Sequence, residues 1–235
     1  MPNHISNLLI VTANNNEEIQ NFLNAIKGNN VRNNVQQVID FNTIIPMPMA
    51  LRNTESSSYI DDAIHYYLAK NNLVEYNRQK MDRLKKSNKE LDELYKIGEM
   101  YVGYEREYGA KDWYDWSCAN WGTKWNAYSS DLIIISDSSV EISFDTAWAG
   151  VPDLIRKLTE MYPNLNFEYK FADENMGFNT GVGYTDEDGF TFYYNEPESY
   201  EAMATYAECK GYDICDLYQD IDGYWHNRAW EDDEE

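Results

Sequence analysis

The stretch VEISFDTAWAGVPDLIRKLTEMYPNLNFEYKF, residues 140–171, carries the clearest structural pattern in this chain of 235 residues. It opens with core-type side chains alternating with polar ones, which predicts a strand with one buried face. Pro152 suits the first turn of a helix, and apolar residues follow it at helical spacing. Alternation then returns, so the stretch predicts a β-α-β unit. The positions expected to face the core are Val140, Ile142, Phe144, Thr146, Phe167, Tyr169 and Phe171.

The flanking segments predict further strands and helices. Apolar residues 7–12 precede an asparagine cluster and a helical pattern that ends near Ile26, and residues 35–45 return as an extended stretch. This predicts another β-α-β unit. Two such units with antiparallel additions indicate an α+β fold of the ferredoxin-like kind. The additions are a strand at 131–136, a hairpin of residues 178–185 and 190–195, and helices at 198–208 and around 212–218.

Residues 54–108 differ from the rest because they are rich in Lys, Glu and Arg and carry apolar residues at helical spacing. We interpret them as a helical insertion. The expected organisation is a ferredoxin-like domain over residues 1–195 containing this insertion, followed by acidic helices and a tail over residues 196–235. The role of the basic run from Arg78 to Lys89 stays open between a solvated helix face and a contact surface.

The composition indicates a folded protein. Hydrophobic residues make up 43% of the chain and 20 residues are tyrosines, so the chain does not resemble a disordered one despite its charge. No apolar run approaches the roughly 20 residues that a membrane span requires, and no secretory signal opens the chain. We therefore expect a protein of the host cell cytoplasm that has no contact with a membrane.

The motifs of metal, cofactor and catalytic sites are missing. The three histidines, His4, His65 and His226, are scattered, and the cysteines form no CxxC pair, so zinc is disfavoured. The Asp186-Glu187-Asp188-Gly189 turn lacks the later ligands of a calcium loop. Gly177, Gly181 and Gly183 fit neither a dinucleotide fingerprint nor a phosphate loop. We accordingly predict no catalytic residue, no cofactor and no metal.

An aromatic block, residues 113–128, allows two interpretations. Lys124 between Trp121 and Trp125 offers the aromatic faces and the cation that stacking on a base or sugar requires. Large aromatic residues are more often core fillers, and this block leads directly into a strand. We favour the core interpretation, above all for Trp125.

Negative charge is concentrated in the second half of the chain. From Phe171 onward there are 18 acidic residues and 2 basic ones. Net charge often serves only solubility, but acidic residues interleaved with aromatic ones are typical of a surface that binds a basic partner. The candidate partner-binding residues are Asp173, Glu174, Asp186, Glu187, Asp188, Glu196, Glu198, Tyr200, Glu201, Glu208, Tyr212, Asp213, Asp216, Asp220 and Asp222.

Three segments resemble signature blocks of a known family. They are FNTIIPMP (residues 41–48), WSCANWGTKWNA (116–127) and FDTAWAGVP (144–152), and they occur in the family's order. The chain is similar in them to a family of uncharacterised phage and conjugative-plasmid proteins with a ferredoxin-like domain. The resemblance implies a mobile-element origin and a ferredoxin-like fold, and it supplies no catalytic residues. The acidic carboxy-terminal part departs from what the family leads us to expect.

These observations favour a non-catalytic binding protein over an enzyme. The expected partner is the basic groove of a host nucleic-acid-handling defence protein, of CRISPR or restriction type, on which the acidic half docks as a DNA mimic. Direct binding of nucleic acid is disfavoured because like charges repel. Two alternatives stay open: a small carboxylate-dependent hydrolase or transferase, and a homo-oligomeric accessory protein.

Overall fold

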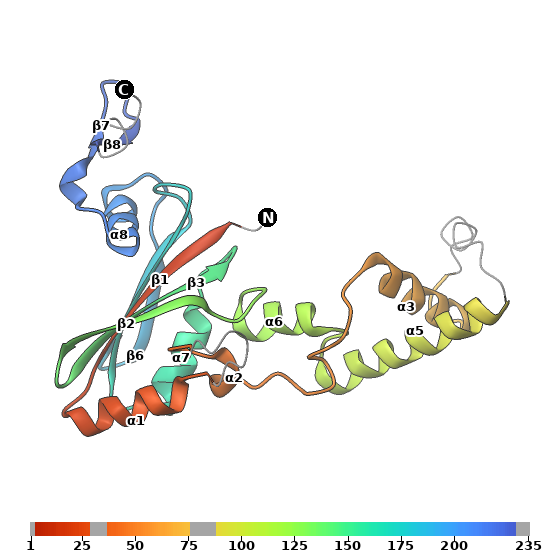
Figure 1. Ribbon diagram of the computed structural model, residues 1–235. Helices are drawn as coiled ribbons and strands as arrows, with labels where there is room; N and C mark the ends of the chain where they lie inside the picture. The colour runs from red at the N-terminus through yellow and green to blue at the C-terminus, as the bar shows by residue number, and fades with distance from the viewer. Residues whose placement is uncertain (1–2, 29–36, 76–87, 229–235) are drawn as a thin grey trace. The chain divides into compact units, whose positions relative to one another are not determined.

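The computed structural model describes residues 3–28, 37–75 and 88–228 (Figure 1). The chain divides into two compact units, of which unit 1 is Met1–Pro46 with Trp121–Glu235 and unit 2 is Met47–Asn120. Unit 2 contains the residues 54–108 expected as a helical insertion, and the residues after 195 lie in unit 1 with the sheet. Among the described residues, no helix has both the length and the hydrophobicity needed to cross a bilayer.

Unit 1 is built on a six-stranded sheet in which all neighbouring strands are antiparallel. The order is β2-β3-β1-β4-β5-β6, so β1 lies between β3 and β4. The connections β1-α1-β2 and β3-α7-β4 therefore each skip one strand, which is the split β-α-β arrangement of the ferredoxin-like fold. The elements are β1 (His4–Thr12), α1 (Asn16–Ile26), β2 (Tyr128–Ser136), β3 (Ser139–Ala147), α7 (Pro152–Met161), β4 (Asn166–Asp173), β5 (Thr180–Asp186) and β6 (Gly189–Tyr194).

The main core lies between one face of this sheet and the helices α1 and α7. Phe22 of α1 meets Phe167 of β4 edge to face, and the amide of Val151, just before α7, donates to the hydroxyl of Tyr169 at 2.7 Å. The predicted inward positions of residues 140–171 are all buried, so the alternation identified the buried face correctly.

A polar cluster at the centre of this core joins three strands. Asn7 of β1 is buried, and its Nδ2 donates to the carbonyl of Phe144 at 3.1 Å and to Thr146 Oγ1 at 2.9 Å, both on β3. Its Oδ1 accepts from the Tyr169 hydroxyl of β4 at 2.6 Å. Burial raises the pKa of Tyr169 well above its usual value, so this hydroxyl stays a donor.

The predicted strand at residues 35–45 is wrong. Its described part, residues 37–45, contains the short helix α2 (Phe41–Ile44), and the strand that completes the first β-α-β unit is β2. Asp40 caps α2 by accepting from the amide of Asn42 at 2.9 Å, and the Phe41 amide donates to Asn126 Oδ1 at 2.8 Å. Phe41 and Ile44, three residues apart, bury their side chains on one face of this turn.

Glycines in β5 make room for aromatic rings of β6. A methyl group added at Gly181 would overlap the rings of Phe192 and Phe171, which stack with their centroids 6.0 Å apart. One at Gly183 would overlap the ring of Phe190. The spacing of Gly181 and Gly183, which fits no nucleotide-binding motif, is therefore explained by packing against these rings.

Helix α8 (Tyr200–Lys210) covers part of the second face of the sheet. A 3₁₀ turn, Ile214–Asp216, and a two-stranded hairpin of β7 (Leu217–Gln219) and β8 (Trp225–Asn227) follow it. The helix predicted around residues 212–218 is thus a turn and a strand. Asp213 accepts from the Cys215 amide at 2.9 Å, which caps a single turn, and Asp220 to Gly223 then form a tight reversal.

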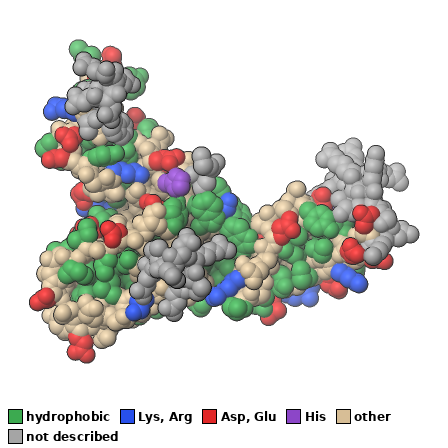
Figure 2. Space-filling model, viewed as in Figure 1, with side chains coloured by type: hydrophobic (Ala, Val, Ile, Leu, Met, Phe, Trp, Pro, Cys, Tyr) green, Lys and Arg blue, Asp and Glu red, His purple; other side chains and the backbone are tan. Residues whose placement is uncertain are grey.

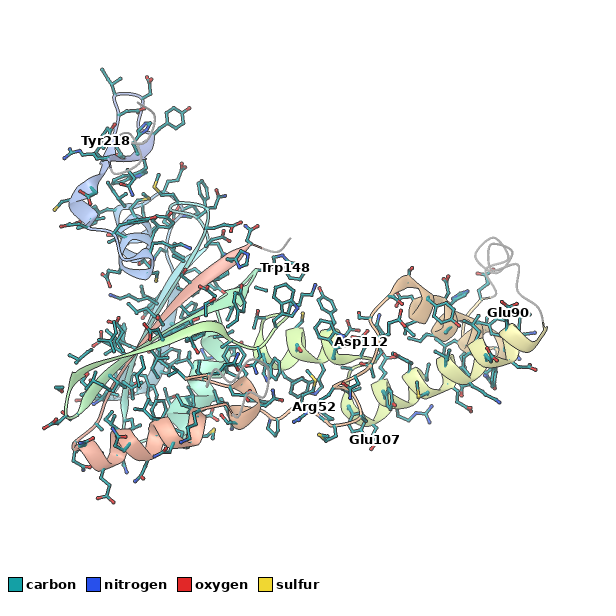
Figure 3. All side chains as sticks on the ribbon, in the orientation of Figure 1. Arg52, Glu90, Glu107, Asp112, Trp148 and Tyr218 are labelled. Carbon is teal, nitrogen blue, oxygen red and sulfur yellow. The ribbon has the colours of Figure 1, made fainter. Side chains whose placement is uncertain are left out.

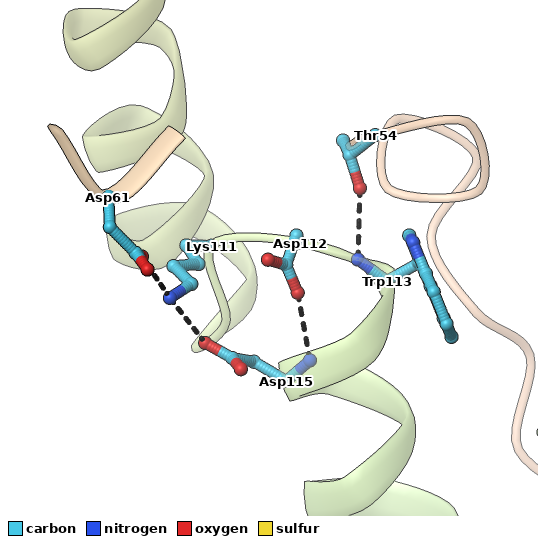
Figure 4. A network of polar contacts seen from close by, with 6 residues as sticks. All are labelled: Thr54, Asp61, Lys111, Asp112, Trp113 and Asp115. Atoms are coloured by element: carbon cyan, nitrogen blue, oxygen red, sulfur yellow. Dashed lines mark hydrogen bonds and ion pairs between the residues drawn. The ribbon is translucent and has the colours of Figure 1, made fainter. Parts of the chain in front are cut away.

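Unit 2 is helical. It contains α3 (Ser58–Lys70) and α5 (Asn88–Tyr108), which pack on each other, and most of α6 (Trp113–Trp121). Lys111 joins two of its elements, because its Nζ contacts Asp61 of α3 at 2.8 Å and Asp115 of α6 at 3.6 Å (Figure 4). The basic residues from Arg78 to Lys86 lie outside the described residues.

The packing of α3 on α5 yields a matched test. A methyl group at Gly98 would overlap the backbone carbonyl of Ala63, whereas nothing lies within 4 Å of one at Gly103 in the same helix. We expect Gly98→Ala to destabilise unit 2 by about 1–3 kcal/mol through overpacking. Gly103→Ala should stabilise it by about 0.5–1 kcal/mol, since Ala is the better helix former. Thermal unfolding followed by circular dichroism compares the two, and equal effects would contradict the close approach.

Candidate protein-docking surface

The carboxy-terminal elements of unit 1 gather exposed acidic and aromatic side chains. Tyr200 and Tyr224 are 63% and 65% exposed, and Ile221 in the turn between β7 and β8 is fully exposed. We call this set the C-terminal acidic surface (the upper left of Figure 2, beside atoms that are not described). Its members are Glu196, Glu198, Tyr200, Glu201, Asp213, Ile221, Asp222 and Tyr224.

A second small core holds these elements on the sheet. Met203, Tyr206 and Ala207 of α8 pack with Ala172 of β4 and with Leu217 of β7. Ser199 caps the helix by accepting from the Ala202 amide at 3.1 Å. The surface therefore stands on a helix whose apolar side is anchored.

The β7-β8 hairpin is fixed to the start of α8. Trp225 donates its indole N–H to the carbonyl of Glu198 at 2.9 Å. Tyr218, labelled in Figure 3, stacks on His226, and the guanidinium of Arg228 lies 5.3 Å from the centre of the Tyr218 ring. The hydrogen bond from Trp225 brings the hairpin and the helix start into one surface, and the ring contacts hold the two strands of the hairpin together.

Several of the candidate acidic residues have structural roles. Asp173 is only 5% exposed, and its carboxylate accepts from the side chains of Asn3 and Asn179, each at 3.0 Å, so it does not belong to a docking surface. Glu174 nearby is exposed and accepts from the His4 amide at 3.3 Å. Glu208 pairs with Lys170 of β4.

Asp220 organises the turn of the β7-β8 hairpin. Its carboxylate accepts from the amides of Asp222 and Tyr224, both at 2.9 Å, and contacts His226 Nε2 at 2.9 Å. The hydrogen bond to His226 and then those to the backbone hold the pKa of Asp220 below its usual value. Asp213 likewise has a lowered pKa, first because it accepts from the Cys215 amide.

The acidic turn between β5 and β6 lies elsewhere. Asp186, Glu187 and Asp188 stand at the far end of β5, whose first residue, Thr180, pairs with Ala172 beneath α8. Six residues of strand separate these points, which is about 20 Å. The structure therefore does not join this turn to the C-terminal acidic surface.

The described basic residues near the surface are occupied by other contacts. Lys210 donates to Ser6 Oγ at 3.0 Å and lies 6.0 Å from the centre of the Tyr206 ring. Of the other candidates, Tyr212 is half-buried and packs beside Tyr206, and Asp216 is half-exposed on the 3₁₀ turn. Residues 230–235, which include five consecutive acidic residues, lie outside the described residues.

The tryptophan block separates into core and surface residues. Trp121 is 4% exposed, and its indole donates to the Ile45 carbonyl at 2.9 Å, so it cannot serve as a ligand platform with Lys124. Trp125 is 37% exposed, so the prediction that it is a core residue is wrong. Lys124 Nζ instead lies 5.1 Å and 5.0 Å from the ring centres of Trp125 and Trp148.

Ile221 is an exposed apolar residue of this surface that was not predicted from the sequence, whereas Tyr224 was expected as one of its aromatic residues. The Asp220-Ile221-Asp222-Gly223 segment carries the signal for Ile221, because Asp and Gly mark a turn whose other residues point outward. Among the residues that the structure describes, no three His, Cys, Asp or Glu side chains converge as a metal site would require.

One family-model match supports the fold. Residues 120–215 match the family model described as a ferredoxin-like domain in Api92-like protein. The chain is also similar to the crystal structure of a protein api92 from Yersinia pseudotuberculosis, at 10% identity over 84% of this chain and 100% of that chain, with a TM-score of 0.42. No curated protein matches the sequence.

The family match confirms the ferredoxin-like α+β fold class predicted from the sequence. The matched range contains β2 through α8. β1 and α1, which complete the split β-α-β pair, lie before it.

Trp121 and Trp125 provide a test of the division between core and surface. We expect Trp121→Ala to lower the free energy of unfolding by about 3–5 kcal/mol, because it removes a buried ring and leaves a cavity. Trp125→Ala should cost less than about 1.5 kcal/mol, since part of the ring is already in water. Denaturant titration measures both, and similar losses for the two variants would contradict the assignment.

The Asp220 turn has an expected pH dependence. A carboxylate with a lowered pKa stabilises the folded hairpin above its ordinary pKa of about 3.9, and this contribution disappears as the pH falls through the lowered value. We expect the β7-β8 amides to lose protection in this acidic range. Asp220→Asn should weaken protection already at neutral pH, while Asp222→Asn on the same turn should not. Hydrogen exchange followed by NMR measures this protection. If Asp220→Asn leaves the protection of the β7-β8 amides unchanged, the carboxylate does not organise the turn.

Proposed function

We propose that this chain is a non-catalytic binding protein of a phage or other mobile element, and that its C-terminal acidic surface docks on a basic surface of a host protein. The expected partner is the nucleic-acid groove of a defence nuclease, of CRISPR or restriction type, in the host cytoplasm. The observation that carries the proposal is the arrangement of exposed carboxylates around exposed aromatic residues on an anchored helix and hairpin.

Electrostatics supports a protein partner with a basic groove. Duplex DNA presents about one negative charge per 1.7 Å of helix axis, and a basic groove built for it attracts other dense arrays of carboxylates. Such attraction speeds association and weakens as salt shortens the field to about 8 Å at physiological ionic strength. The net charge of −22, concentrated in the second half of the chain, adds to this attraction.

The aromatic residues supply what charge alone does not. Tyr200 lies beside Glu201 at the start of α8, and Tyr224 lies near Asp222 in the hairpin turn. Rigid aromatic side chains among polar ones are typical of residues that dominate binding energy. A surface that served solubility alone would not need these rings exposed.

The test uses two double variants with the same change in charge. Glu196→Lys with Glu201→Lys alters the C-terminal acidic surface, and Glu187→Lys with Asp188→Lys alters the turn at the far end of β5. We expect the first to weaken binding to a partner captured from host lysate by about tenfold or more, mainly through slower association, and the second to have a much smaller effect. Surface plasmon resonance at low and high salt measures both.

Competition by duplex DNA identifies the groove. Duplex DNA should displace the wild-type chain from the captured partner if both occupy the same basic surface. Equal affinities of the two double variants would contradict the assignment of the docking surface. Binding that duplex DNA does not reduce would contradict the proposal that the chain mimics DNA.

A further inference from the structure

The edge strand β2 exposes an unusual apolar run. Ile133, Ile134 and Ile135 are 53%, 56% and 53% exposed. Successive side chains of a strand point to opposite faces of the sheet, so Ile134 lies on one face and Ile133 and Ile135 lie on the other. Both faces of this strand are therefore open to solvent. Elsewhere along the strand, Leu132 is half-buried and lines a hollow with Leu23 of α1 and Val38.

The outer edge of β2 is covered over only part of its length. At its start, the Val38 amide donates to Ser130 Oγ at 3.1 Å, and Gln37 Nε2 donates to the Ala127 carbonyl at 2.8 Å. Residues 131–136 pair with β3 on one side, and no strand among the described residues pairs with them on the other. An unpaired backbone edge flanked by apolar side chains is a template for a further strand.

The charges around this edge select its occupant. Residues 128–147, which form β2, β3 and their turn, contain Asp131, Asp137, Glu141 and Asp145 and no Lys or Arg. Lys27 of α1 lines the hollow beside Leu132, and its Nζ donates to Asn24 Oδ1 at 2.7 Å. Antiparallel pairing of β2 with a second copy would place the Asp131 of each copy near the Asp137 end of the other. Like charges at such positions are destabilising, so these acids act against self-association.

From this geometry we infer that residues 131–136 of β2 bind an extended segment of another protein by strand addition, and that this segment carries β-branched or other apolar residues flanked by Lys or Arg. The isoleucines contact its apolar side chains, and Asp131 and Asp137 face its basic ends. β2 lies at the opposite edge of the sheet from β6, so this site is separate from the C-terminal acidic surface and does not depend on the proposed function.

The experiment uses three synthetic peptides and the full isotope-labelled chain. The first is Lys-Lys-Val-Thr-Val-Thr-Val-Thr-Lys-Lys, the second replaces every Lys by Glu, and the third keeps the Lys residues but has Pro in place of two of the central residues. We expect the first to bind at least about tenfold more tightly than the other two, because only it combines strand propensity with basic ends. It should protect the backbone amides of residues 131–136 from exchange.

Variants locate the site. Ile133→Lys with Ile135→Lys should abolish this binding while leaving the melting temperature nearly unchanged, since both side chains are more than half exposed. The matched control, Ile221→Lys, alters a fully exposed isoleucine of the β7-β8 turn and should leave binding intact.

Four results would overturn the inference. The first is that the first peptide does not bind, and the second is that the proline peptide binds equally well. The third is that the NMR signals changed by the peptide belong to the C-terminal acidic surface instead of β2. The fourth is that β2 becomes protected without peptide as the protein concentration rises and that sedimentation shows a dimer. The last would assign the edge to a second copy of the chain.

Discussion

The hydrogen bonds of Asn7 are the constraint on which the sheet of unit 1 depends. A buried amide must find partners, and this one finds them on β3 and β4 at once, with Tyr169 passing the network on to the Val151 amide before α7. A shift of β1 by one residue would turn the amide to the other face and leave these groups unpaired. The register of three central strands and the entry into α7 are thus set by a few polar atoms inside an apolar core.

Sequence patterns predicted what depends on local periodicity. The alternation from Val140 to Thr146 identified the buried face of β3, and Pro152 marked the start of α7. They did not predict what depends on distant partners: the amide of Phe41 pairs with Asn126, so an apolar run became a helical turn. The first β-α-β unit was correct in kind, but its second strand, β2, follows unit 2 in the sequence, so no local signal could connect it with β1.

The candidate site was predictable in composition and not in position. Counting acids located the charged end of the chain, but short Asp side chains often bond to nearby backbone amides, as Asp213 and Asp220 do here. Such carboxylates help to build the surface rather than extend from it. Whether an acid caps a turn or faces solvent depends on backbone geometry that a residue count does not contain, and the same holds for Trp125, which precedes a strand and is still partly exposed.

The hydrogen bond from the Trp121 indole to the Ile45 carbonyl has a consequence for how the chain folds. It holds together the two points at which the backbone leaves unit 1 and returns to it, on either side of Met47–Asn120. Pairing β1 with its neighbour β3 requires closing a loop of more than a hundred residues, because Thr12 pairs with Ser139, and such closure slows folding. The contacts between α3 and α5 are local in comparison, so we expect unit 2 to form early and to shorten the loop that the sheet must close. The same adjacency makes unit 2 an insertion whose length and sequence can change in evolution while the sheet keeps its strand order.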